Sequence, residues 1–394
     1  FTLVYSTVWF FDLYYGAAAA LGAYGVFYMR HQEVVGGHYE VQNPVVNIVF
    51  GLVVAGVVAW ALFEILYPRL RGRFSRRSIQ GAVGLAGILA GLYTGLLLVY
   101  PDNLHLLFGP VAGLAVGVAV ALALREGLVR VTSSEDGPMA TLVPAIIGLA
   151  VGAGAAAYIA DRPESGLYLS WAVSCLLAGC VGLGLYRGLY VTLRNRARSP
   201  LIMLVASMGI LLAISATITI VFESAPRPLP PAFGSGPIEF GGGNIKGFNF
   251  FTVGVSLAGF AGLLWLLQRT SFGRSVRAIG DDEDVSKVVG INTTVVIAIV
   301  FFIGAAFAAM AGILSGHDTA IQPRMGLLLL LKGWIASVVG GIGNLYGALL
   351  GGFALGMVEQ FGIWDLAGEW KDVISFVVLI LFLSFWPKGV LPRK

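Results

Sequence analysis

Long apolar runs constrain the fold of this chain more than any other feature of its sequence. The runs are about as long as the 20 residues that an α-helix needs to cross a membrane, and most end at arginine, proline or acidic clusters. Because lipid cannot satisfy unpaired backbone groups, such runs fold there as helices. Only 12% of the residues are charged, compared with about a quarter in soluble domains. A large soluble helical core is disfavoured because its helices would need polar faces.

We therefore expect an all-α fold, a polytopic transmembrane helical bundle that forms one domain over residues 1–394. The expected spans, about ten in number, cover residues 7–29, 45–67, 80–100, 106–124, 142–160, 167–187, 201–222, 248–268, 294–316 and 373–387. Residues 327–360, between the last two spans, are apolar but interrupted by glycines. This stretch predicts a re-entrant or paired half-helix element.

The basic residues are distributed unevenly between the connecting loops. Of the 25 lysines and arginines, 18 lie at the C-terminus and in the loops at 68–79, 125–141, 187–200 and 268–293. Cytoplasmic loops carry such an excess, so these segments are assigned to the cytoplasm. Successive spans must place their connecting loops on alternate sides of the membrane. The assigned loops fit this alternation only if residues 327–360 begin and end on the outer side. The net charge of +4 therefore reflects topology and does not indicate a nucleic-acid partner.

Sequence motifs for catalysis or ATP binding are missing from the chain. No lysine follows a glycine, so the P-loop cannot be present and ATP hydrolysis needs another polypeptide. The glycine run at 340–347 fails the dinucleotide pattern because Tyr346 stands where the third glycine belongs. The four histidines have no metal-ligand spacing. We expect no catalytic residue, no metal site and no enzyme activity.

The cytoplasmic loop at 268–293 is too long for a simple turn between spans. Its centre predicts a short helix, since aspartates can cap the start and Gly290 suits the end. Three valines fall at i, i+3 and i+4 and form an apolar stripe. Such a helix has no core of its own to cover, so the stripe fits a groove on a partner protein. The alternative, a loop lying on lipid headgroups, is weakened by four neighbouring acidic residues.

This loop also carries a family resemblance. The stretch from Ser271 to Asn292 resembles the cytoplasmic loop of branched-chain amino acid ABC transporter permeases, in which FGR-x-x-RA precedes an acidic helix and GIN. The segment Gly333–Gly356 is similar to the glycine-rich stretch of that family, and Pro387–Leu391 is similar to its closing P-x-G-L. The similarity extends over residues 185–391. In the family, the loop docks on an ATPase subunit. The coupling residues that the resemblance implies are Arg274, Arg277, Gly280, Asp281, Asp282, Glu283, Val285, Val288, Val289 and Gly290.

The resemblance implies one permease subunit of an ABC importer in a prokaryotic inner membrane, working by alternating access. The implied partners are a second permease subunit, identical or homologous, two cytosolic ATPase subunits that carry the ATP, an extracytoplasmic solute-binding protein and the bilayer. No cofactor is expected on this chain. The implied substrates are branched-chain or other hydrophobic amino acids. Alternatives are urea or short amides, a gradient-coupled secondary transporter, and a structural membrane subunit that does not transport.

The chain departs from the family pattern in two places. The usual NFAHG is replaced by Asp12-Leu13-Tyr14-Tyr15-Gly16, close to the translocation path in relatives. The segment 76–165 has no counterpart and predicts an insertion of about four extra spans.

Polar groups inside apolar runs are the candidates for a translocation path, because they are costly in lipid. Lys332 and Glu359 flank the glycine break, whose backbone groups can face a zwitterionic solute as half-helix ends do in transporters. Alternatively, Lys332 reaches toward the membrane surface and the glycines allow close helix packing. The candidate path residues are Asp12, Tyr15, Lys332, Gly340, Gly341, Gly343, Asn344 and Glu359.

Overall fold

The computed structural model describes residues 3–5, 12–30, 43–70, 75–132, 138–162, 165–196, 200–232, 236–240, 243–362, 364, 370–386 and 389–391. Residues 7–11 of the first expected span, and Pro387 and Lys388 of the closing motif, lie outside this part of the chain.

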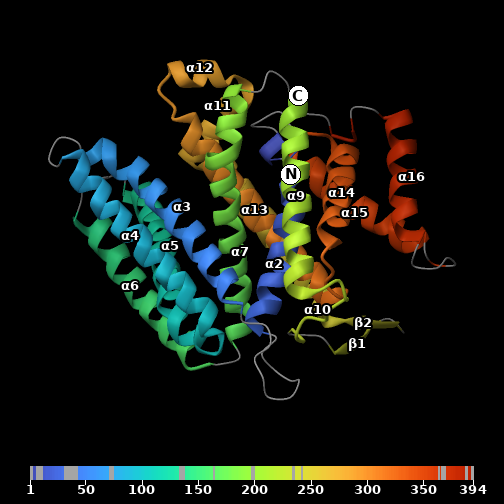
Figure 1. Ribbon diagram of the computed structural model, residues 1–394, viewed down its shortest axis with the longest axis horizontal. Coiled ribbons are helices and arrows are strands. Elements are labelled where there is room, and N and C mark those ends of the chain that lie inside the picture. The colour runs from blue at the N-terminus through green and yellow to red at the C-terminus, as the bar shows by residue number, and fades with distance from the viewer. Residues whose placement is uncertain are drawn as a thin grey trace.

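The described chain is a bundle of helices (Figure 1). The long helices are α2 (Tyr14–Arg30), α3 (Pro44–Leu70), α4 (Arg76–Val99), α5 (Leu104–Thr132), α6 (Pro138–Ala160), α7 (Gly166–Leu185), α9 (Pro200–Phe222), α10 (Gly247–Arg269), α13 (Thr293–Asp318), α14 (Met325–Gly340), α15 (Leu345–Gly362) and α16 (Trp370–Phe385). The short ones are η1 (Pro101–Asn103), the π-helix η3 (Tyr186–Tyr190), α8 (Val191–Arg196), α11 (Ser271–Asp281) and α12 (Glu283–Val288). The predicted helical membrane bundle is confirmed.

Eight described helices are long and apolar enough to cross a membrane, and the bent pair α14–α15 makes a ninth if it counts as one span. The sequence predicted about ten spans. The difference comes from α2 and α16, whose 17 and 16 residues fall short of 18.

The predicted glycine-broken element is the pair α14–α15. The two helices meet at a bend of 116°. Gly341 and Gly343 have φ angles of +112° and +87°, which only glycine adopts without strain. The second helix therefore turns back instead of continuing the first.

Helix α2 forms the centre of the bundle, since 14 of its 17 residues are buried. It packs against α7, α9, α13 and α14. Small residues allow these close approaches: a side chain at Gly22 would collide with the backbone of Ala309, and one at Gly312 with that of Ala19. The alanine and glycine content of α2 thus brings four helices within reach of one another.

Helices α3, α4, α5 and α6 lie together on one side of the molecule (Figure 1). The α5–α6 pair is close-packed at Gly117 and Gly148, where side chains would collide with the facing backbone. The predicted insertion at 76–165 covers α4, α5 and α6, but α3 shares their position. Whether this group is an insertion stays a prediction.

The two ends of the bundle differ. Helices α11 and α12 stand at the end that the arginine distribution assigns to the cytoplasm (Figure 1). The opposite end carries an antiparallel hairpin of β1 (Pro237–Phe240) and β2 (Gly243–Lys246). This proline- and glycine-rich segment lies between the spans expected at 201–222 and 248–268, so the hairpin adds a detail to the all-α fold.

Candidate functional site

The turn that leads into the predicted coupling loop depends on Gly273. A side chain at this position would collide with the Leu267 carbonyl, so only glycine fits between α10 and α11. Val276 is buried against the core, whereas Arg274 and Arg277 are exposed. Helix α11 is therefore amphipathic, with its apolar face holding it on the bundle.

Helix α12 has well-defined ends despite its short length. An Asp282 carboxylate oxygen accepts hydrogen bonds from the amides of Asp284 and Val285, at 2.9 and 3.0 Å, and caps the start. Gly290, with a φ of +93°, ends the helix in a Schellman motif. The predicted short helix and both predicted ends agree with this geometry.

Lys287 stabilises the polar side of α12. Its ammonium group lies 3.1 Å from a Glu283 carboxylate oxygen and 3.0 Å from one of Asp284. These hydrogen bonds raise the pKa of Lys287 above its ordinary value of 10.5. The lysine therefore stays charged at physiological pH and partly offsets the acidic start of the helix.

The other side of α12 is apolar and open. The exposed fractions of Val285, Val288 and Val289 are 58%, 87% and 74%. The structure thus brings the predicted coupling residues together at one end of the bundle, with three valines facing outward. Large exposed apolar groups beyond the membrane-crossing helices mark a contact surface for another protein.

Asp12 and Tyr15, two of the predicted path residues, lie inside the bundle and not along an open surface. Their exposed fractions are 1% and 4%. One Asp12 carboxylate oxygen accepts from the Tyr14 amide at 2.9 Å and from the Tyr190 hydroxyl at 2.7 Å. The neighbouring Leu13 amide donates to the Ser207 hydroxyl at 3.1 Å. Asp12 therefore caps α2 and joins it to η3.

Lys332 and Glu359 meet although 27 positions separate them in the sequence. The Lys332 ammonium lies 3.3 Å from Glu359 and 2.9 Å from Asp372 of α16. The Ser375 hydroxyl also hydrogen-bonds Glu359, which is only 5% exposed. Three helices are thus joined by one charged cluster. The alternative in which Lys332 reaches toward the membrane surface stays a prediction.

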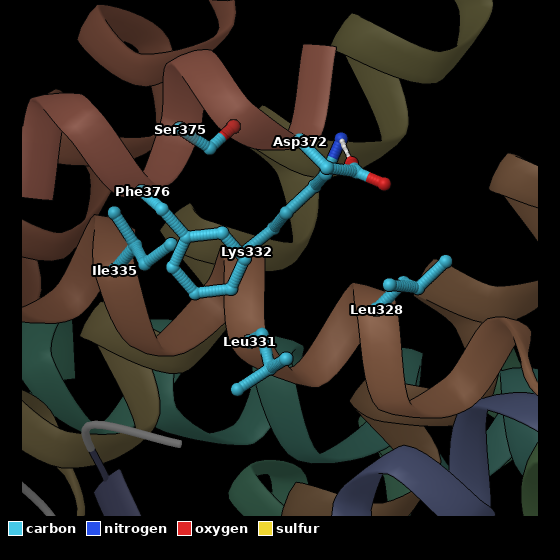
Figure 2. A pocket seen from close by; sticks show the side chains of 7 residues that line it. All are labelled: Leu328, Leu331, Lys332, Ile335, Asp372, Ser375 and Phe376. Carbon is cyan, nitrogen blue, oxygen red and sulfur yellow. Dashed lines mark ion pairs between the residues drawn. The ribbon is translucent and has the colours of Figure 1, made fainter. Parts of the chain in front are cut away.

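A small pocket adjoins this cluster (Figure 2). It is lined by Leu328, Leu331, Lys332, Ile335, Asp372, Ser375 and Phe376. Its volume of about 10 Å³ is about what one water molecule needs. In this conformation the pocket does not accommodate an amino acid.

The glycine break is closed by the C-terminal segment. The amides of Val390 and Leu391 donate to the carbonyls of Val339 and Gly340, both at 3.0 Å. The Asn344 side chain donates to the Leu391 carbonyl at 3.1 Å. The hypothesis that these carbonyls face a solute is therefore not supported by this conformation, because other backbone groups already occupy them.

The remaining polar and glycine positions of the break have structural roles. The Asn344 side-chain oxygen (Oδ1) accepts from the Tyr346 amide at 3.0 Å and caps α15. A side chain at Gly340 would collide with the backbone of Gly347. The Tyr346 hydroxyl accepts from Gln268, at the cytoplasmic end of α10. The break therefore lies at the cytoplasmic end, and helix packing is the better explanation of its glycines.

The predicted path residues thus form three separate groups: one around Asp12, one around Lys332 and one at the break. The sequence analysis missed Tyr190, Ser207, Asp372 and Ser375 as members of the first two groups. Asp372 carried a signal, because it is an acidic residue at the start of an apolar run. Ser207 carried none, since serines are common in such helices.

The comparisons with known proteins agree on one family. The sequence model described as branched-chain amino acid transport system / permease component matches residues 145–383. The high-affinity branched-chain amino acid transport system permease protein BraD of Pseudomonas aeruginosa is 30% identical over 304 residues, which cover 74% of this chain and 98% of BraD. The permease protein LivH of Escherichia coli K12, from a transport system of the same description, is 34% identical over 223 residues, covering 55% of this chain and 72% of LivH.

A relative that is named for another substrate also matches. The autoinducer 2 import system permease protein LsrC of Yersinia pestis is 29% identical over 286 residues, covering 68% of this chain and 74% of LsrC. No solved structure matches the chain. The relatives are permease proteins, and the family match includes the α11–α12 loop and the broken helix pair. The chain belongs to the family of permease components of branched-chain amino acid transport systems.

Proposed function

We propose that this chain is one of two transmembrane subunits of an ABC importer that moves branched-chain or other hydrophobic amino acids by alternating access. ATP is bound and hydrolysed by two separate cytosolic subunits, and an extracytoplasmic binding protein delivers the solute. The complex lies in a prokaryotic inner membrane. The substrate class is supported by the similarity to BraD and LivH, which are named as permease proteins of branched-chain amino acid transport systems.

The observation that carries this proposal is the apolar face of α12. Helix α12 lies at one end of the bundle (Figure 1), and its three valines are exposed. Exposed valine side chains are stabilised when a partner buries them. The three valines give α12 a small apolar contact surface. The capped ends and the Lys287 ion pairs stabilise α12 in the absence of a partner.

The location of the path is inferred from two sites in the described part of the chain. The pocket beside Lys332 has room for about one water molecule, and Asp12 is buried inside the bundle. A path for an amino acid is therefore proposed to form between two permease subunits and not inside one of them. In this arrangement four side chains affect the path indirectly, because they hold helices in position: Asp12, Tyr15, Lys332 and Glu359.

The docking test uses the double variant Val285→Asp/Val288→Asp and the cognate ATPase subunits. We expect the variant to lose copurification of the ATPase while its thermal stability in detergent stays unchanged, because both side chains are exposed. The matched control is Ser271→Asp, an exposed position on α11 that lies off the valine face. Retention of the ATPase by the double variant would remove the docking proposal.

The transport test uses proteoliposomes that contain the full complex, the binding protein and labelled leucine. Uptake that requires ATP and survives dissipation of the ion gradients supports an importer driven by the ATPase. Uptake by this chain alone that collapses with the gradients identifies a secondary transporter. Uptake of urea in place of leucine identifies an amide permease, and no uptake of any solute favours a structural subunit.

A further inference from the structure

A buried side-chain hydrogen bond joins the central helix to the π-helix. The Tyr190 hydroxyl donates to an Asp12 carboxylate oxygen at 2.7 Å, and each residue is only 1% exposed. The same oxygen accepts from the Tyr14 amide at the start of α2. The bond therefore fixes the cytoplasmic end of α2 relative to η3.

Tyr190 lies in a π-helical turn. The Val191 amide bonds to the Tyr186 carbonyl, five residues back, which defines a π turn. Such turns are rare and are frequently found at functional sites. Tyr186 and Tyr190 both face the core, where they pack on Phe301 of α13 at ring distances of 4.8 and 5.5 Å.

Helix α13 leads from these rings directly to the coupling helix. Phe301 is completely buried, and Tyr15 of α2 also packs on it at 6.2 Å. Only residues 289–292 separate α12 from α13, and this short connection is held at both ends. The Ile291 amide bonds back into α12, while the Asn292 side chain caps α13. A displacement of α12 therefore reaches Phe301 through a rigid helix of about two turns.

In the described structure, two buried polar atoms lack hydrogen-bond partners where α2, η3 and α13 meet. Within the described part of the chain, the second oxygen of Asp12 and the hydroxyl of Tyr15 are buried and have no hydrogen-bond partner. Buried polar groups are normally satisfied, so each exception calls for an explanation. These two atoms would gain hydrogen bonds in a second arrangement of the same groups, and a small displacement could select between two such arrangements.

We propose that Tyr190 is a positioning residue of the transport cycle: its hydrogen bond to Asp12 transmits movement of the coupling helix α12, through Phe301 and η3, to the central helix α2. This inference rests on the proposed function, because it assigns a route between ATPase docking and the membrane helices. It differs from a purely structural role, since it predicts that loss of one hydroxyl separates ATP hydrolysis from transport.

The test is Tyr190→Phe in the full complex, which removes the hydroxyl and keeps the ring on Phe301. We expect the ATPase to copurify as with the wild type, and the amount of leucine moved per ATP hydrolysed to fall about fivefold or more, the lower end of ordinary coupling between sites. The control is Tyr14→Phe. Tyr14 is also buried on α2, but its hydroxyl bonds to the Ala178 backbone carbonyl at 2.8 Å, away from η3.

A rescue variant separates the hydrogen bond from the charge. Asp12→Asn keeps a carbonyl oxygen for Tyr190 and the Tyr14 amide, so we expect a transport-to-hydrolysis ratio close to that of the wild type. An unchanged ratio in Tyr190→Phe overturns the inference, as does an equal loss in Tyr14→Phe or in Asp12→Asn. A wild-type complex that neither retains the ATPase nor transports overturns the proposed function instead, so the two failures are distinguishable.

Discussion

The Lys332 ammonium lies 2.9 Å from the Asp372 carboxylate, and this ion pair joins the first arm of the broken helix element to α16. Glu359 of the second arm binds the same ammonium group at 3.3 Å. One cation therefore links three helices, which also pack through an apolar cluster that contains Ile335, Leu355 and Leu379.

Removing this cation should destabilise the helices strongly. Lys332→Leu leaves Glu359, which is 5% exposed, as a buried charge without its counterion, and we expect a loss of about 3 kcal/mol. Thermal unfolding in detergent at a fixed heating rate measures the change. The double variant Lys332→Leu/Glu359→Leu should recover most of the stability, because it removes the buried charge as well. A double variant as unstable as the single one would contradict this account.

Close packing at the helix break predicts a sharp difference between glycines of the same element. Gly340→Ala places a methyl group against the Gly347 backbone, which should cost about 1–3 kcal/mol or more. Gly352→Ala meets nothing within 4 Å and should be neutral or stabilising by up to about 1 kcal/mol, since alanine favours a helix. Melting temperatures of the two purified variants test the contrast. Similar values for both would mean that the break tolerates wider spacing.

The cap of α12 should affect docking without affecting the membrane bundle. Asp282→Ala removes the acceptor of two amide hydrogen bonds, which should weaken the helix by about 1 kcal/mol. We expect faster amide hydrogen exchange in residues 283–288 and weaker retention of the ATPase subunits. Asp282→Asn keeps an acceptor and should restore both. Slow exchange in the alanine variant would show that the flanking helices alone order α12.

The Lys287 ion pairs predict how α12 responds to alkaline pH. The pKa of Lys287 is raised by its bonds to Asp284 and Glu283, so the folded helix binds this proton more tightly than the unfolded chain does. Its contribution to stability is therefore fully present below pH 10.5 and is lost as the pH rises through the higher folded value. Helix α12 should keep the same hydrogen-exchange rates, corrected for intrinsic pH dependence, between pH 7 and about 9.

A neutral substitution gives the matching control for that ion pair. Lys287→Met should weaken α12 by no more than about 0.5 kcal/mol, because the pair is exposed and screened by salt. Added salt should bring the wild type closer to the variant. A large effect at high salt would indicate that Lys287 packs against a partner.

The sequence predicted the helices well where hydropathy alone decides them. The span predicted at 248–268 appears as Gly247–Arg269, and that at 294–316 as Thr293–Asp318. The short helix α12 was also predictable, because its capping aspartate and closing glycine act within a few residues of the backbone groups they satisfy. Such local features need no knowledge of the rest of the fold.

The candidate site was less predictable because its contacts join distant segments. Asp12 and Tyr190 are separated by 178 positions, and no periodic pattern relates a residue before one helix to a residue at the end of another. The closure of the break by the C-terminal segment was unpredictable for the same reason. Nothing in the glycine-rich stretch itself indicates that Val390 and Leu391 will occupy its carbonyls.

That contact between the break and the C-terminal segment has a consequence for biosynthesis. The end of α14 receives its last hydrogen bonds from residues that the ribosome adds some fifty positions later. Until then the carbonyls at the end of α14 need other hydrogen-bond donors, from water or from a chaperone. The broken helix pair is thus among the last parts of the subunit to become complete, and an epitope tag placed directly after Leu391 would act on assembly before it acted on transport.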